Sequence, residues 1–126
     1  MFLRFIVRKQ DQDSRSFIGL FTQAYDLRES HDLERYEEER LESFLGWMRK
    51  NLEAPKCLDE PENERAICWF KHTAKTPLEK AWEMVSLLQD RGVPIEMIKT
   101  HDPGTIIYED EWQVAAKPRK KDRIRV

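Results

Sequence analysis

The stretch AICWFKHTAKTPLEKAWEMVSLLQDRGVPIEMIKT, residues 66–100, decides the fold of this chain. It opens on a wholly apolar run at 66–70, passes through a polar link and an amphipathic segment, and ends in a second apolar run after Gly92. Short apolar runs on either side of an amphipathic segment predict a strand, a helix and a second strand. Two strands connected in this way are expected to lie side by side and parallel, with a right-handed crossover.

The helix at the centre of this unit has start and stop signals of its own. Thr76 and Glu79 have the spacing of a capping box, and Pro77 suits the first helical position, where its missing N–H costs nothing. Gly92 readily adopts the left-handed conformation in which many helices end. The predicted helix therefore covers residues 77–91. Its apolar face consists of Leu78, Ala81, Trp82, Val85 and Leu88.

The residues before this unit predict one strand and two helices. The alternation of apolar and basic residues at 2–8 indicates a strand with one buried face. Apolar residues at helical spacing predict a helix from Phe17 to near Glu29, and a second helix with an acidic entry after residues 30–32. The two helices are expected to form an antiparallel hairpin on the sheet. Residues 53–65, with two prolines and five acidic residues, predict a loop.

The residues after the central unit predict a β-hairpin and a basic tail. Pro103-Gly104 suits the centre of a turn, and the apolar runs at 105–108 and 112–116 suit the two strands of the hairpin. A chain of 126 residues is the size of one domain. We therefore predict a single α+β domain over residues 1–117 and a basic C-terminal tail over 118–126. The domain would hold a mixed sheet of four to five strands, a helical hairpin and one crossover helix, in the order β-α-α-β-α-β-β-β.

Composition limits the class of protein. Charged residues make up 37% of the chain and hydrophobic ones 40%, which indicates a compact domain with an ionised surface rather than a disordered segment. No apolar run approaches the ~20 residues of a membrane-spanning helix, and the opening residues are too short and too charged for a secretory signal. Cys57 lies in a polar loop and Cys68 in an apolar strand, which favours two free thiols. These features predict a cytoplasmic protein with no membrane partner.

Charge is divided unevenly along the chain. Both ends are basic, whereas residues 10–65 hold 15 acidic against 8 basic residues. The asymmetry predicts an acidic partner for the ends, or association of the basic ends with the acidic middle of another copy; a solvated tail is the simpler alternative. The residues expected to contact nucleic acid or another acidic partner are Arg4, Arg8, Lys117, Arg119, Lys120 and Lys121. Nucleic acid is the lesser alternative, because the pI is near 6.0 and no recognition motif accompanies the tail.

Polar residues follow both strands of the central unit. If these strands are parallel neighbours, residues 71–73 and 100–102 meet at one edge of the sheet, where open sheets with crossover helices usually bind ligands. The residues expected to bind an anion or another ligand there, beside the amino end of the helix, are Lys71, His72, Thr73 and Lys75. His72, His101 and Asp102 are weak candidates for proton transfer. The alternative is a pair of ordinary surface turns.

Neither a metal nor a cofactor is predicted. The histidines at 31, 72 and 101 lack the spacing of metal ligands, and no CxxC, HxxxH or EF-hand pattern occurs. Gly-rich phosphate loops, nucleophile turns and dinucleotide fingerprints are also missing from the sequence. A cation at Glu109-Asp110-Glu111 would need a further carboxylate, and such a turn is more often plain solvated surface.

Several segments resemble one family of proteins. They are residues 67–71 with the helix that follows, Pro103-Gly104, Tyr108-Glu109-Asp110-Glu111 and Gln113-Val114. Together they resemble a family of small bacterial proteins of unknown function, over nearly the whole chain apart from the basic tail. The resemblance implies no activity, cofactor or catalytic residue.

The sequence as a whole predicts a small cytosolic accessory or partner-binding protein without catalytic activity, which binds another protein or a second copy of itself. Its contact surfaces would be the acidic second helix and loop, or the edge with Lys71, His72 and His101. Two alternatives stay open: a nucleic-acid-binding accessory protein that uses the basic termini, and a small hydrolase or transferase that uses His72 and His101. A cleft that holds both histidines would favour the enzyme.

Overall fold

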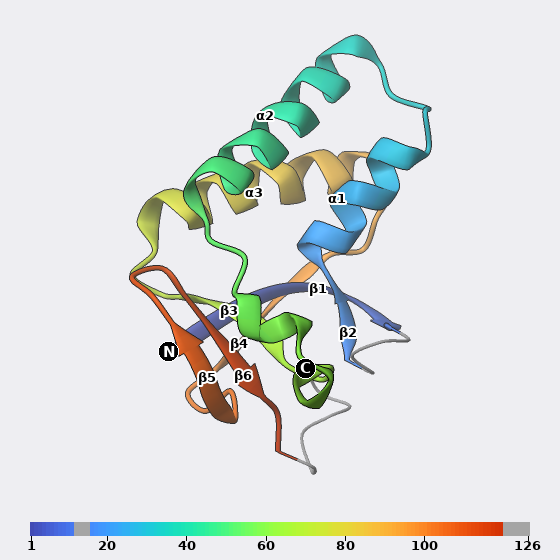
Figure 1. The fold of residues 1–126 in the computed structure, drawn as a ribbon. Helices are drawn as coiled ribbons and strands as arrows, with labels where there is room; N and C mark the ends of the chain where they lie inside the picture. Colours follow the sequence, from blue (N-terminus) through green and yellow to red (C-terminus); the bar gives the residue numbers. More distant parts are fainter. Residues whose placement is uncertain (12–15, 120–126) are drawn as a thin grey trace.

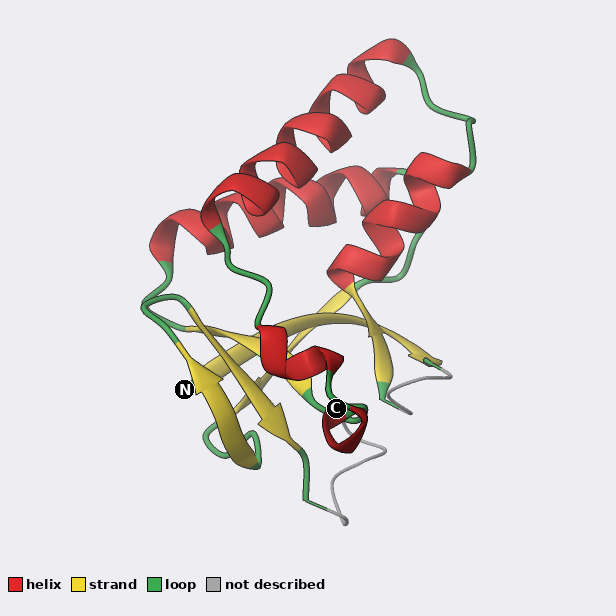
Figure 2. Ribbon diagram, in the orientation of Figure 1, coloured by secondary structure: helices red, strands yellow, loops and turns green. Residues whose placement is uncertain are grey.

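The computed structural model describes residues 1–11 and 16–119, and these form two layers. Three helices lie over one face of a six-stranded sheet (Figures 1 and 2). The strands are β1 (Phe2–Gln10), β2 (Phe17–Gly19), β3 (Ile67–Lys71), β4 (Glu96–Thr100), β5 (Thr105–Glu109) and β6 (Gln113–Lys117). The helices are α1 (Leu20–Glu29), α2 (Arg35–Asn51) and α3 (Lys75–Asp90), and two short 3-10 helices, η1 (Lys56–Asp59) and η2 (Pro61–Asn63), interrupt the predicted loop. The predicted α+β class and element order are confirmed, with β2 as an additional strand.

Strand β1 is the centre of the sheet. Along one edge it pairs with β4, from Phe2 opposite Thr100 to Ile6 opposite Glu96. Along the other edge it pairs with β3 near its beginning and with β2 near its end. Strand β6 continues the sheet beyond β3, and β5 lies beyond β6. Every pairing is antiparallel, so the prediction of a mixed sheet with four to five strands is wrong in the kind of pairing and in the number of strands.

The central unit is a split strand–helix–strand. Strands β3 and β4 both run antiparallel to β1, so they point in the same direction, as predicted. They are not neighbours, because β1 lies between them and bonds to both. Such a split arrangement is a recurrent motif, and a strand from elsewhere in the chain can enter it because a crossover helix spans two strand spacings. The prediction of adjacent parallel strands is therefore wrong.

The first helix begins later than its apolar pattern predicts. Phe17, Ile18 and Gly19 form β2, in which Gly19 lies opposite Ile6 of β1, and α1 starts at Leu20. Backbone pairing with β1 thus overrides the helical spacing of Phe17. Gly19 also leaves room for a neighbour, since a Cβ atom there would lie 3.1 Å from Nη2 of Arg4.

Helix α3 also differs from its predicted start. It begins at Lys75 with Ala74 as N-cap, and no side chain caps it, so the capping box of Thr76 and Glu79 is wrong. Pro77 is buried inside the first turn, where it packs in the core. A true capping box instead opens α2, where Glu34 caps the helix and its N–H donates to Oε1 of Glu37 at 3.0 Å. The predicted end of α3 holds, since Gly92 has a φ of 83°.

The main core lies between the sheet and the helices. Phe5 on the central strand is 1% exposed, and its ring makes edge contacts with Phe70 and Trp82 at centroid distances of 6.5 and 4.9 Å. Ala81, Val85 and Leu88 of the predicted α3 stripe are buried, whereas Trp82 is half exposed. A smaller cluster on the opposite face of the sheet contains Ile67, Trp69 and Val114. Both faces of β3 are therefore covered.

An ion cluster ties α3 to the start of α2. Nη1 of Arg91 donates to both carboxylate oxygens of Glu37, at 3.0 and 2.9 Å. Nη2 of Arg91 donates to the backbone oxygen and to Oδ2 of Asp32, at 3.1 and 3.2 Å. Glu37 is buried, so its charge is held by these partners rather than by water. The hydrogen bonds from Arg91 and from the Glu34 N–H keep the pKa of Glu37 below its usual value.

Removal of the Phe5 ring tests the core around β1. We expect Phe5→Ala to lower the free energy of unfolding by about 3–5 kcal/mol, because the substitution deletes a fully buried ring and leaves a cavity between β1 and α3. Tyr36→Ala is the matched control, since Tyr36 is 62% exposed and its loss should change stability by about 0.5 kcal/mol or less. Urea unfolding followed by circular dichroism measures both values. Equal effects of the two substitutions would contradict the assigned core.

The Arg91 cluster predicts a pH-dependent contribution to stability. Because the folded-state pKa of Glu37 is lowered, its stabilising effect is complete above the unfolded pKa near 4.5 and is lost as the pH falls through the folded pKa. Glu37→Gln should therefore lower the Tm at pH 7. The difference in Tm between the variant and wild type should become smaller below about pH 4.5. Thermal melts from pH 7 to pH 3 measure the gap. Glu39→Gln, an exposed change on the same helix, serves as control, and a gap that stays constant with pH would refute the cluster's role.

Candidate functional site

The predicted ligand edge forms, but the backbone of Met1 and Phe2 occupies its middle. Lys71 and Thr100 both lie opposite Phe2, on the two sides of β1, so two strand spacings, about 10 Å, separate them. The His72 N–H donates to the Met1 carbonyl at 3.1 Å, and Nδ1 of His72 lies 3.2 Å from the same oxygen. Lys71 pairs with Glu109 at 2.6 Å. Thr73 and Lys75 are exposed at the start of α3.

His101 and Asp102 belong to a turn on the surface. The Asp102 carbonyl accepts a hydrogen bond from Oγ1 of Thr100, and Oδ1 of Asp102 accepts one from the Gly104 N–H at 3.1 Å. Oδ2 of Asp102 pairs with Arg119. His72 and His101 are exposed, and neither lines either of the two cavities described below. In the described part of the chain, the backbone of Met1 and Phe2 therefore lies between the strand ends that carry the two histidines.

The acidic turn of the β5–β6 hairpin holds the hairpin together. Oδ1 of Asp110 accepts hydrogen bonds from the N–H groups of Trp112 and Gln113, both at 2.9 Å. Oδ2 accepts one from the Tyr108 hydroxyl at 2.7 Å and one from the Gln113 side chain at 3.2 Å. Burial by itself would raise the pKa of Asp110, but these four donors outweigh it and hold the pKa below its usual value. The interpretation of this turn as plain solvated surface is wrong for Asp110.

Metal ligation finds no support in this turn. Within residues 1–11 and 16–119, no three side chains of His, Cys, Asp or Glu are grouped closely enough to hold a metal ion. The Asp110 carboxylate is occupied by protein donors, and Gln113 extends the network by donating to the Glu53 carbonyl at 2.6 Å. The network therefore links the hairpin turn to the segment after α2.

The basic residues predicted to contact an acidic partner are dispersed. Nη2 of Arg4 donates to the Phe17 carbonyl at 2.6 Å inside a cavity, so Arg4 does not lie on an open surface. Arg8 pairs with Glu96 at 2.6 Å and lies over the Phe17 ring. Arg119 pairs with Asp102, and Lys117 is half-buried at the end of β6. Lys120 and Lys121 lie outside the described residues.

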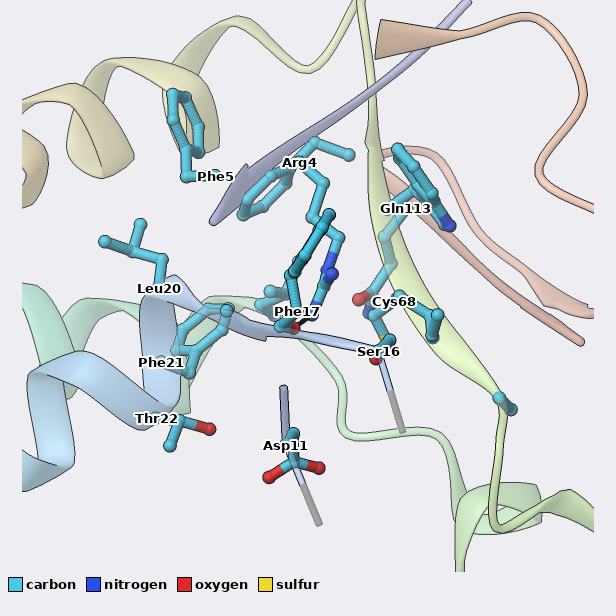
Figure 3. A pocket seen from close by; sticks show the side chains of 16 residues that line it. Arg4, Phe5, Asp11, Ser16, Phe17, Leu20, Phe21, Thr22, Cys68 and Gln113 are labelled. Carbon is cyan, nitrogen blue, oxygen red and sulfur yellow. Dashed lines mark hydrogen bonds between the residues drawn. The ribbon is translucent and has the colours of Figure 1, made fainter. Parts of the chain in front are cut away.

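Two hollows that the sequence analysis missed are the strongest candidate sites. The first, which we call the fork cavity, has a volume of about 210 Å³ and lies where β2 and β3 separate along the same edge of β1. Figure 3 shows Arg4 reaching from β1 into it, with Phe17, Ser16 and Cys68 around the guanidinium. The second, the helix groove, has a volume of about 460 Å³ and lies between α2 and α3. Its walls come from segments that are about forty residues apart in the chain.

Two local signals point to these hollows. Arg4 interrupts the apolar run of a buried strand, and a charged residue in such a position needs a special environment. Tyr36 lies off the apolar stripe of α2, where it is 62% exposed beside the helix groove. Neither signal reveals the residues on the opposite wall, since these depend on tertiary packing.

Cys57 and Cys68 are both free thiols, as predicted. Burial raises the pKa of Cys68 to about 11, and the nearby Arg4 opposes that rise only in part. At neutral pH Cys68 is therefore an uncharged thiol with little nucleophilic character. It contributes a soft, apolar surface to the fork cavity.

Comparison with protein-family models, with curated proteins and with solved structures finds no match for this chain. The resemblance to small bacterial proteins therefore stays a prediction. A search of the described part of the chain finds no helix that is long and apolar enough to cross a membrane.

Tyrosine ionisation tests the Asp110 network. The hydrogen bond that the Tyr108 hydroxyl donates to Asp110 raises the pKa of Tyr108 to about 12, because the neutral phenol is the form that can donate. Spectrophotometric titration near 295 nm should show one tyrosine of the three that ionises last, and Tyr108→Phe should remove that step. Tyr36→Phe is the control and should leave that step in place. Persistence of the last step in Tyr108→Phe would contradict the network.

Proposed function

We propose that this protein is a cytosolic accessory protein without catalytic activity, and that it binds another protein through the helix groove. The observation that carries the proposal is the groove itself, a hollow between α2 and α3 that combines apolar residues with charged ones. The exposure of His72 and His101, with the backbone of Met1 and Phe2 between them, weighs against the hydrolase or transferase alternative. The dispersal of Arg4, Arg8 and Arg119 weighs against the nucleic-acid alternative.

The groove has an apolar floor and a polar rim. Phe44, Met84 and Leu87 form the floor and are 4%, 2% and 2% exposed, so the hollow is bounded by well-packed side chains. Tyr36 stands at the rim with most of its ring in solvent. An exposed aromatic residue beside an apolar hollow is the usual composition of a binding hot spot. Arg40 closes part of the rim by donating to the Glu83 carbonyl at 3.3 Å.

The charge around the groove selects the partner. Glu39 and Glu83 line the groove, and Glu38 and Glu42 are exposed on the same helix as Glu39. The nearby bases are Arg35, which pairs with Glu39 at 3.4 Å, and Arg40. Two acids, Glu39 and Glu83, therefore line the groove against one lining base, Arg40, and this excess of acid favours a positively charged partner.

A basic amphipathic helix fits these features best. Such a helix places two or three apolar side chains on one stripe, at the spacing that a groove between two helices accepts, and its flanking lysines or arginines would lie over the acidic rim. This partner agrees with the acidic second helix that the sequence analysis selects as a contact surface. The free state of Cys57 and Cys68 agrees with a reducing compartment.

Charge reversal at the rim tests the proposal. The immobilised full chain is used to capture a protein from an extract, and that protein is then purified and titrated against wild type and Glu39→Lys/Glu83→Lys. We expect at least a tenfold loss of affinity in the variant, because attraction becomes repulsion. The affinity of the wild type should also fall as the salt concentration is raised, because salt screens the attraction. Tyr36→Ala should weaken binding as well while the Tm stays unchanged.

Glu60→Lys/Glu62→Lys is the matched control, with the same change of charge in the exposed loop between α2 and β3. It should bind with wild-type affinity. Wild-type affinity in the groove variant together with a loss in the loop variant would move the contact surface to the loop and overturn the proposal.

A further inference from the structure

Strand β4 ends the sheet on one side. It pairs with β1 along one edge, over five consecutive residue pairs without a shift of register. In the part of the chain that the structure describes, no strand lies along the other edge of β4. The backbone N–H and C=O groups on the outer edge of such a strand can bond to a further strand. Strand β4 is therefore a regular template on which the sheet can be extended.

The other two strands at the border of the sheet are irregular. Strand β2 has only three residues, and its pairing with β1 shifts register between Val7 and Gln10. The pairing of β5 with β6 shifts register between Ile106 and Tyr108. Short edge strands and β-bulges are devices by which proteins prevent an edge from pairing with another chain. Strand β4 has five residues, no shift and no proline, so it lacks these devices.

The apolar side chains of β4 are incompletely covered. Met97 packs against the core on the helix side of the sheet, and Ile98 packs against the smaller cluster on the opposite side. Both side chains are only half-buried. A strand placed beside β4 would cover Met97 on one face and Ile98 on the other. Apolar burial therefore favours an added strand, as the free backbone groups do.

A second copy of β4 supplies a matching strand. When two identical strands pair antiparallel about a two-fold axis perpendicular to the sheet, one residue lies opposite its own copy. With Ile98 at this axis, all five residues of each strand have a partner. Met97 then lies opposite Lys99 of the other copy, whose aliphatic stem covers it. Glu96 lies opposite the uncharged Thr100, so no like charges are directly opposed.

Other centres suit the sequence of β4 less well. With Lys99 at the axis two lysines lie directly opposite each other, and with Glu96 at the axis two glutamates do; like charges in this position destabilise a pair of strands. With Met97 at the axis, the carboxylate of Glu96 lies opposite the apolar side chain of Ile98. Each of these centres also leaves part of both strands unpaired. The residue pattern therefore selects Ile98 as the centre.

We propose that two copies of this protein associate through the outer edges of their β4 strands, in antiparallel pairing centred on Ile98. The two sheets then form one continuous sheet across the interface. This inference does not rest on the helix groove, which lies between α2 and α3, or on the partner proposed for it.

The wild-type protein alone provides the first test. Sedimentation equilibrium of the full chain over a wide range of concentrations should show the mass rising from 15.2 kDa toward twice that value. In a mixture of isotope-labelled and unlabelled protein, filtered NMR spectra should show NOE contacts between the Met97 methyl group of one copy and the Lys99 side chain of the other. A protein that stays monomeric at every concentration would overturn the proposal, and so would a dimer without these contacts.

Opposite charge changes at Met97 test the register. In each dimer Met97→Lys twice places a lysine opposite Lys99, whereas Met97→Glu places a glutamate there. Both changes remove the same apolar side chain, so the loss of packing is matched. We expect the dissociation constant of the Met97→Lys dimer to be at least tenfold higher than that of the Met97→Glu dimer.

The matched controls are Ile106→Lys and Ile106→Glu, which make the same changes of charge on the other edge strand, β5, where Ile106 is 42% exposed. These two variants should have equal dissociation constants. Equal constants for the two Met97 variants, or a difference between the Ile106 variants instead, would overturn the proposal. Circular dichroism shows whether each variant is folded, and the wild-type NOE contacts decide the question if one is not.

Discussion

The pairing of β1 along both of its edges is the constraint on which the structure depends. This strand donates and accepts backbone hydrogen bonds toward β4 on one side and toward β3 and β2 on the other, so it joins three segments that are far apart in the chain. Its buried face supports the helical layer through Phe5, and the helices in turn shield these hydrogen bonds from water. The two hollows follow from this arrangement, one from the division of an edge of β1 and the other from how two helices meet above it.

Local features of the chain, including one hairpin, were predictable from the sequence, and the strand pairings outside that hairpin were not. The hairpin at 105–117, the class, the element order and the glycine end of α3 follow from propensity and spacing, which are properties of short segments. Phe17 has helical spacing but is a strand residue, because it pairs with Gln10 of β1, and the next two residues, Ile18 and Gly19, pair with Val7 and Ile6. The insertion of β1 between β3 and β4 likewise depends on partners that are distant in the sequence. An apolar strand carries little information about which edge it will join.

In the candidate sites too, local residue types were predictable from the sequence, whereas the neighbours that tertiary packing supplies were not. Residue types led to the histidines at 72 and 101, and the structure brings their strand ends to one edge of the sheet, but Met1 and Phe2 lie between them. The fork cavity and the helix groove combine residues whose roles cannot be recognised from each residue alone. Arg4 becomes notable only beside Cys68 and Phe17, and Tyr36 only above the floor that Met84 and Leu87 provide. Buried networks such as Arg91 with Glu37 likewise need partners more than fifty positions apart.

The position of β1 in the middle of the sheet also affects how the chain folds during its synthesis. Ile6 pairs with Glu96, ninety positions later, so the central strand leaves the ribosome long before its partner on that edge exists. At about 5–20 residues per second, the wait is roughly 5–20 seconds, during which Leu3, Phe5 and Ile6 are unprotected by β4. Contacts of such long range also make a protein fold slowly. The apolar residues of β1 therefore stay without their β4 partner until ninety or more further residues have been synthesised.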